Sequence, residues 1–138
     1  MTSNPGPSLQ AQAGQPASAR KIEQSIAYMR RHLNEPLQVA ELAQTAHTSP
    51  SHFFVLFKRW AGSSPIDYFI RLRMEQACQM LAATTLSVKE VAAQLGYHDP
   101  FYFSRVFKSV NGIAPSDYRQ TTRRFAQTNG TARWGEFC

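Results

Sequence analysis

The sequence carries one pattern of residues twice, once between Leu37 and Tyr68 and again between Leu86 and Arg119. The matched residues keep the same order and the same intervals, apart from one extra residue before Phe103 in the second copy. They are Val39, Glu41, Ala43, Phe53, Phe57, Lys58, Gly62, Pro65, Asp67 and Tyr68 in the first copy, and Val88, Glu90, Ala92, Phe103, Phe107, Lys108, Gly112, Pro115, Asp117 and Tyr118 in the second. A repeat of about fifty residues predicts one structural unit used twice.

The size and composition of the chain fit one ordinary domain. Its 138 residues are too few for two full-sized domains, and a hydrophobic share of 43% with 12% aromatic residues is enough for a core. The formal net charge of +6 suggests a polyanionic partner, but proteins that bind no nucleic acid also carry such a charge. Charge alone therefore leaves the partner open.

Cysteine spacing and hydropathy exclude several classes of protein. Cys78 and Cys138 form no CxxC pair and have no histidine at a metal-ligand interval, so neither a metal nor a cofactor is expected. Cys78 falls within a helical apolar pattern and is expected to be a buried thiol. The sequence shows neither an apolar N-terminal signal segment nor an apolar run near the roughly 18 residues of a membrane span. We therefore expect a soluble, cytoplasmic protein without a membrane partner.

The apolar periodicity predicts an all-α fold of about seven helices and no strands. A capping residue stands directly before a proline at Ser49 and at Asp99, which predicts helices over 50–60 and 100–110, each followed by a glycine. Ser87 and the glutamate three residues later fit a capping box at the start of a shorter helix. Local signals therefore mark where each repeat begins its helices.

The residues expected to face inward follow the three-to-four spacing of a helix. They are Ile22, Ile26, Met29, Leu33 and Leu37 in a first helix that starts at Arg20; Phe53, Leu56, Phe57 and Trp60 in helix 50–60; Ile66, Phe69, Ile70, Met74, Ala77 and Leu81 in a longer helix from Pro65 to about Ala83; and Phe103, Val106, Phe107 and Val110 in helix 100–110.

Composition sets the expected boundaries of the domain. The first 19 residues have no charged side chain and almost no large apolar one, so they cannot bury enough surface to offset the entropy of ordering. The predicted organisation is a disordered linker or tail at 1–19, a double helix-turn-helix domain at 20–121 and a basic, flexible tail at 122–138. Within the domain, the first unit covers about 20–64, the linker helix about 65–84 and the second unit about 85–121.

Two helix-turn-helix units in a basic chain point to double-stranded DNA as the partner. At about 1.5 Å per residue, the helix that links the repeats spans roughly 28 Å. Successive major-groove segments on one face of DNA are separated by roughly 34 Å. We therefore expect the linker helix to hold two reading helices about one DNA turn apart.

The outward faces of helices 50–60 and 100–110 supply the candidates for base contact. They are Ser51, His52, Phe54 and Val55 in the first repeat, and Phe101, Tyr102, Ser104 and Arg105 in the second. Arg105 can donate to both O6 and N7 of guanine, and the apolar pair Phe54 and Val55 can contact thymine methyl groups. The alternatives are that Arg105 is an ordinary surface residue and that a neighbouring element covers Phe54 and Val55.

Four further residues are candidates for phosphate contact, which sets register and affinity but carries no sequence information. They are Lys58, Arg59, Ser87 and Lys108. The backbone amides at the helix starts near Pro65 and Ser87 could add phosphate bonds.

The second repeat carries the most specific motif, VAAQLGYHDPFYFSRVFKSVNGIAPSDYR, and with it the chain resembles the DNA-binding domain of AraC/XylS-type bacterial transcription regulators. The resemblance covers about Arg20 to Thr121. It implies two helix-turn-helix units joined by a long helix, with reading helices 50–60 and 100–110 in successive major grooves and RNA polymerase as a further partner.

Two features depart from what this resemblance implies. Members of the family commonly have polar or basic residues where this chain has Phe54 and Val55, which puts hydrogen-bond reading by the first unit in doubt. Most members also carry a ligand-binding or dimerisation domain before this one, where the chain has its Pro-, Gln- and Ala-rich start. The chain is therefore either a short stand-alone member or a piece of a longer regulator.

Two other classes of function fit the sequence less well. An enzyme is not expected, because the sequence has no nucleophile elbow, glycine-rich phosphate loop, metal cluster or usefully spaced carboxylate pair. The stronger alternative is a helical protein-interaction module, in which the exposed aromatic residues bind another protein and the positive charge is incidental.

Overall fold

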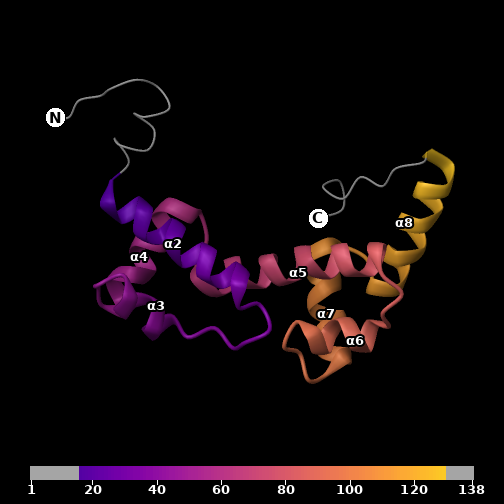
Figure 1. Ribbon diagram of the computed structural model, residues 1–138, viewed down its shortest axis with the longest axis horizontal. Coiled ribbons are helices and arrows are strands. Elements are labelled where there is room, and N and C mark those ends of the chain that lie inside the picture. Colours follow the sequence, from indigo (N-terminus) through magenta and orange to yellow (C-terminus); the bar gives the residue numbers. More distant parts are fainter. Residues whose placement is uncertain (1–15, 130–138) are drawn as a thin grey trace. The chain divides into compact units, whose positions relative to one another are not determined.

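The structure, a computed structural model, describes residues 16–129, with side chains as far as Phe125. In that range it has seven helices and no strand, which confirms the predicted all-α class (Figure 1). The helices are α2 (Ala17–Arg31), α3 (Val39–Thr45), α4 (Pro50–Ala61), α5 (Pro65–Ala83), α6 (Val88–Gln94), α7 (Pro100–Asn111) and α8 (Pro115–Asn129). None of these helices is long and apolar enough to cross a bilayer.

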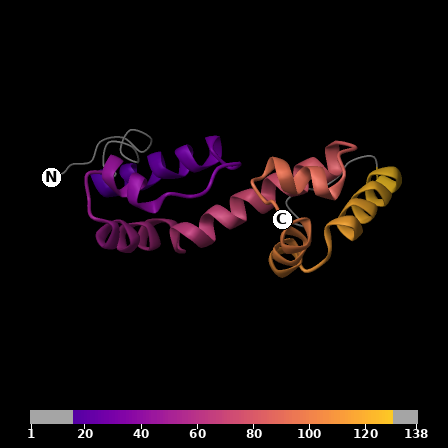
Figure 2. The ribbon, with the colours of Figure 1, turned by 90° about the horizontal axis from the view of Figure 1, so that it is seen from below.

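The chain forms two compact units. Unit 1 contains the described residues up to Arg31 together with Leu37–Tyr68, and unit 2 contains His32–Pro36 together with the described residues from Phe69 onward. Helix α5 is unbroken and contributes its first turn to unit 1 and the rest to unit 2 (Figure 2). The loop that follows α2 therefore belongs to unit 2, although it precedes α3 in the chain.

Unit 1 is built on α4. Both α2 and α3 pack against this helix, which buries Phe53 and Phe57 completely. The ring of Phe57 lies 5.8 Å from that of Phe53 and meets Tyr68 edge-on at 5.5 Å. Other buried apolar side chains of the unit lie in α2, in α3 and at the C-cap of α3: Ala19, Ile22, Met29, Leu42, Ala43 and Ala46. Pro65, the first residue of α5, is buried as well.

Unit 2 repeats this design with α6, α7 and α8. Phe103 and Phe107 of α7 are fully buried, their rings 6.0 Å apart, and Phe107 meets Tyr118 edge-on at 5.7 Å. Cys78 is buried in this core, as the sequence predicted. The other buried members of the core are Met74, Ala77, Leu81, Val91, Ala92, Leu95 and Tyr97.

The predicted caps are present. The Ser49 hydroxyl accepts a hydrogen bond from the His52 amide at 3.2 Å, and the Asp99 carboxylate accepts one from Phe101 at 2.9 Å. Ser87 and Glu90 form the predicted capping box, because each accepts a hydrogen bond from the other's backbone amide, at 3.0 and 2.8 Å. The backbone amide and the hydroxyl of Ser87 both lower the pKa of the Glu90 carboxyl.

Three residues that were predicted to face inward are exposed: Trp60 by 41%, Val110 by 42% and Ile66 by 56%. In α4 and α7 the buried row follows i, i+4 spacing, so it continues from each second phenylalanine to Ala61 and Asn111, which are half-buried. Ile66 lies beside the buried Pro65, one position away from the row that Phe69 continues in α5. The predicted three-residue step was wrong at these places.

The ends of the folded region also differ from the prediction. Helix α2 begins at Ala17, so residues 17–19 are helical, and it ends at Arg31, so Leu33 lies beyond it and packs against the core of unit 2. Helix α8 continues to Asn129, which corrects the predicted flexible tail over residues 122–129. The tail predictions for residues 1–15 and 130–138 lie outside the described residues.

One arginine side chain connects α8 to the end of α5. Arg119 donates from Nε to the Leu81 carbonyl at 2.8 Å and from Nη2 to the Thr84 carbonyl at 3.3 Å. These carbonyls belong to the C-terminal turn of α5 and the residue after it, where backbone acceptors have no helical partner. Arg119, in the last helix of the second repeat, therefore caps the C-terminal end of α5, the helix that precedes this repeat.

Gly96→Ala should destabilise the chain more than Gly112→Ala. Both glycines have positive φ, +86° and +87°, where a Cβ is strained. An added Cβ at Gly96 would also lie 2.8 Å from the Asn34 carbonyl oxygen, whereas one at Gly112 would meet nothing within 4 Å. We expect losses in the free energy of unfolding of about 2–4 kcal/mol at Gly96 and about 1 kcal/mol at Gly112, measured in urea. Equal losses would contradict the close packing at Gly96.

Candidate nucleic-acid interface

Helix α4 presents one face to its own unit and the opposite face to solvent. All six candidate residues on this helix are exposed: Ser51, His52, Phe54, Val55, Lys58 and Arg59. Phe54 is 44% exposed and Val55 60%, so no element in the described part of the chain covers them. The alternative that a neighbouring element buries this pair is therefore not supported.

Helix α7 presents a similar face with a different composition. Phe101 is 80% exposed and Tyr102 50%, and Arg105 and Lys108 are exposed as well. Ser104 is only half-buried, so it can reach a ligand less readily than its neighbours. The face of α7 therefore combines aromatic rings with two positive charges.

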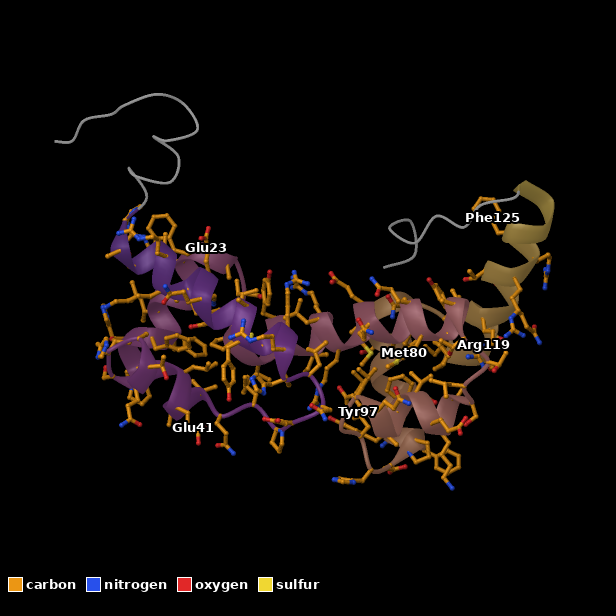
Figure 3. All side chains as sticks on the ribbon, viewed as in Figure 1. Glu23, Glu41, Met80, Tyr97, Arg119 and Phe125 are labelled. Carbon is orange, nitrogen blue, oxygen red and sulfur yellow. The ribbon has the colours of Figure 1, made fainter. Side chains whose placement is uncertain are left out.

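Aromatic contacts organise the face of α7. The guanidinium carbon of Arg105 lies 6.0 Å from the centre of the Tyr102 ring, and that ring lies 6.0 Å from the ring of Tyr97. Tyr97 lies in the turn before α7 (Figure 3). It is buried, and its ring lies 5.4 Å from that of Phe103. Tyr97 was not among the predicted site residues, although it differs from Thr48, which stands at the matching place of the first repeat.

The electrostatics of both faces favour an anion. Neither α4 nor α7 contains an acidic residue. Asp99, the N-cap of α7, directly precedes that helix. Lys58 and Arg59 lie in the last turn of α4, and the Arg59 guanidinium carbon lies 5.5 Å from the centre of the Trp60 ring. Positive side chains therefore flank the apolar face, where phosphates would lie beside a groove.

The remaining phosphate candidate, Ser87, takes part in the capping box with Glu90. Its backbone amide donates to Glu90, and its hydroxyl oxygen accepts from the Glu90 amide. The Ser87 amide is therefore taken by the Glu90 carboxylate, and the Ser87 hydroxyl also lowers the pKa of that carboxyl. A phosphate contact at this helix start stays a prediction. Among the described residues, no cluster of three or more His, Cys, Asp or Glu side chains can hold a metal ion.

Known proteins with similar sequences are regulators of transcription. A family model described as a helix-turn-helix domain matches residues 42–121. The MmsAB operon regulatory protein of Pseudomonas aeruginosa is 43% identical over 98 residues, which cover 71% of this chain and 32% of that protein. The HTH-type transcriptional activator Btr of Bacillus subtilis is 33% identical over 114 residues, covering 83% of this chain and 22% of that protein. The chain thus spans no more than about a third of the length of these relatives.

Solved structures show the same architecture. The DNA-binding domain of AdpA, a global transcriptional factor solved in complex with a target DNA, matches with a TM-score of 0.71 and 31% identity, covering 75% of this chain and 94% of that one. A transcriptional regulator with an AraC-type DNA-binding domain from Chromobacterium violaceum matches with a TM-score of 0.70 and 26% identity, covering 75% and 92%.

Phe101→Ala should cost much less free energy of unfolding than Phe103→Ala, because the two residues lie on opposite faces of α7. Phe101 is 80% exposed, so its loss should change the free energy of unfolding by less than about 0.5 kcal/mol. Phe103 is fully buried, so its truncation should cost about 3–5 kcal/mol. Denaturant unfolding of both variants tests this, and a large loss at Phe101 would mean that its ring is covered.

Proposed function

We propose how this chain, which belongs to the AraC/XylS family of helix-turn-helix regulators, recognises DNA. In the proposal it binds double-stranded DNA in a sequence-specific manner and controls transcription, with α4 and α7 entering successive major-groove segments. The observation that carries the proposal is the matched pair of exposed, acid-free faces on α4 and α7. An α-helix fits the major groove, and base edges there are distinguishable.

Helix α4 reads mainly by shape and apolar contact. Phe54 and Val55 meet thymine methyl groups, the one apolar group that the major groove offers. Ser51 and His52, in the first turn of the helix, are placed where helix-turn-helix proteins contact base edges. The first half-site should therefore favour T·A pairs and tolerate substitution.

Helix α7 reads by hydrogen bonds. Arg105 donates to guanine, and Tyr102, with its ring against Arg105, limits the directions in which the guanidinium can point. Phe101 and Ser104 border the same groove, with Phe101 supplying apolar contact. The second half-site should therefore be the more selective.

Phosphate contacts set the register of both helices. Lys58 and Arg59 act for α4, and Lys108 and Ser87 act for the second unit. Such contacts add affinity on every sequence and make binding dependent on salt.

The proposal extends to the setting and the partners of the chain. The relatives are named as an operon regulator and a transcriptional activator, and the chain matches only a fraction of their lengths. We propose that the chain works at the bacterial nucleoid, in the cytoplasm, with RNA polymerase as a further partner and with a separate ligand-binding or dimerisation domain. No catalytic role is part of the proposal, since the relatives are named as regulators and not as enzymes.

Arg105→Ala should relax discrimination at one base pair. Loss of the guanidinium removes a bidentate contact, so affinity for DNA with the preferred base should fall by roughly 1–3 kcal/mol, while DNA with another base there should lose less. Binding titrations on duplexes that differ at that pair measure the change. Arg30→Ala, which removes an equal charge from the last turn of α2, is the control. An equal loss on all sequences would refute the base contact.

Lys108→Ala should weaken binding to all sequences alike. The slope of log affinity against log salt should fall by about one, because one fewer counterion is released. Titrations over a range of salt concentrations provide the slope, with Arg30→Ala again as the control. An unchanged slope would remove Lys108 from the phosphate contacts, and a wild-type slope near zero would favour the protein-interaction module.

A further inference from the structure

Arg73 of α5 makes an unusual set of contacts within unit 2. Its Nε donates to the Leu33 carbonyl at 2.7 Å, and its Nη2 donates to the Glu35 carbonyl at 2.8 Å. Its guanidinium carbon lies 4.5 Å from the centre of the Phe69 ring and 5.0 Å from that of Tyr97. Lysine has neither the planar fork nor the stacking surface to make all four contacts.

These contacts clamp the turn between α6 and α7. The backbone at Gly96 is so close to the loop 32–36 that an added Cβ would lie 2.8 Å from both the Asn34 carbonyl oxygen and Arg73 Nη2. The next residue, Tyr97, donates its amide to the Ala92 carbonyl at 2.9 Å and places its ring against Arg73. The turn is therefore fixed by its backbone and by the Tyr97 side chain.

From this turn, aromatic contacts lead to the exposed face of α7. The Tyr97 ring lies 6.0 Å from Tyr102, and Tyr102 lies 6.0 Å from the Arg105 guanidinium carbon. A shift of Tyr97 would therefore change the space open to Tyr102, and a shift of Tyr102 would change the directions open to Arg105. Arg73 itself is half-buried and occupied by carbonyls, so it is not placed to donate to DNA.

We infer that Arg73 is a positioning residue for base recognition by α7, acting through Tyr97 and Tyr102 on Arg105. The inference rests on the proposed function. A contact group held in its binding geometry loses less entropy on binding and discriminates better than one that must be ordered by the ligand. Arg73 therefore contributes to specificity at the second half-site without touching a base.

The first repeat provides an internal comparison. Its turn has His47 and Thr48 at the places of Gly96 and Tyr97, so no ring stands at the place of Tyr97, and His47 has a positive φ of 59°. Within residues 16–129, a clamp of the Arg73 type therefore has no counterpart at the turn before α4. Loss of Arg73 should change reading by α7 and leave reading by α4 as it was.

The test is Arg73→Lys, which keeps the charge, with Arg71→Lys at an exposed position of the same helix as the control. The probes are the duplex that the wild-type chain enriches from a random library and two derivatives with either the first or the second half-site scrambled. We expect Arg73→Lys to lower discrimination at the second half-site by about 2- to 30-fold, with discrimination at the first half-site and the salt slope unchanged. Equal losses at both half-sites, or no loss, would overturn the inference.

Tyr97 variants keep the inference testable if Arg73→Lys folds poorly. Tyr97→Leu removes the ring and should lower discrimination at the second half-site as Arg73→Lys does. Tyr97→Phe keeps the ring and should discriminate as the wild type does. In the DNA-free protein, Arg73→Lys should speed hydrogen exchange at the Gly96 and Tyr97 amides ahead of the rest of unit 2. If Tyr97→Leu discriminates as the wild type does, the inference fails. If the wild-type chain enriches no sequence, the proposed function fails, and the inference fails with it.

Discussion

The structure depends on one interaction that occurs in both units, the burial of two phenylalanines four residues apart on a proline-started helix. Phe53 and Phe57 anchor α4, and Phe103 and Phe107 anchor α7; all four are fully buried, and in each unit the second ring meets a tyrosine edge-on. Residues four apart lie on one side of a helix, so this anchoring leaves the opposite side facing outward along the whole length of the helix. The candidate DNA-binding face is thus a geometric consequence of the core.

Local chemistry made much of this fold predictable. Caps at Ser49, Ser87 and Asp99 depend on residues two or three positions away, and the prolines that follow two of them start helices whatever the rest of the chain does. The inward row was harder to predict, because three- and four-residue steps fit the same short pattern, and only packing decides between them at Trp60 and Val110. Residues 1–19 looked unable to bury enough surface, and residues 122–138 were predicted to be a basic, flexible tail. Residues 17–19 and 122–129 nevertheless belong to helices α2 and α8, whose other residues pack in the folded units.

What the sequence could not predict is contact between distant segments. Arg73 bonds carbonyls 38 and 40 residues earlier in the chain, and no spacing rule connects those positions. The exposure of a candidate residue was predictable where it lies opposite the buried phenylalanines. This holds for Phe54, Val55, Phe101, Tyr102 and Arg105. Tyr97 was missed because its ring is buried and contacts Tyr102 of the exposed face without belonging to that face. The two repeats, similar in their cores, therefore differ most in what supports their outward faces.

The central claim is that the two outward faces read DNA with different chemistry. Selection of bound sequences from a random duplex library at about 150 mM salt tests it most directly, because weak phosphate-only binding is suppressed there. The account predicts two enriched blocks, one sharply defined with a required guanine and one tolerant and rich in T·A pairs. Two blocks of equal sharpness would contradict the difference in chemistry, and the absence of any enriched sequence would contradict DNA reading by this chain.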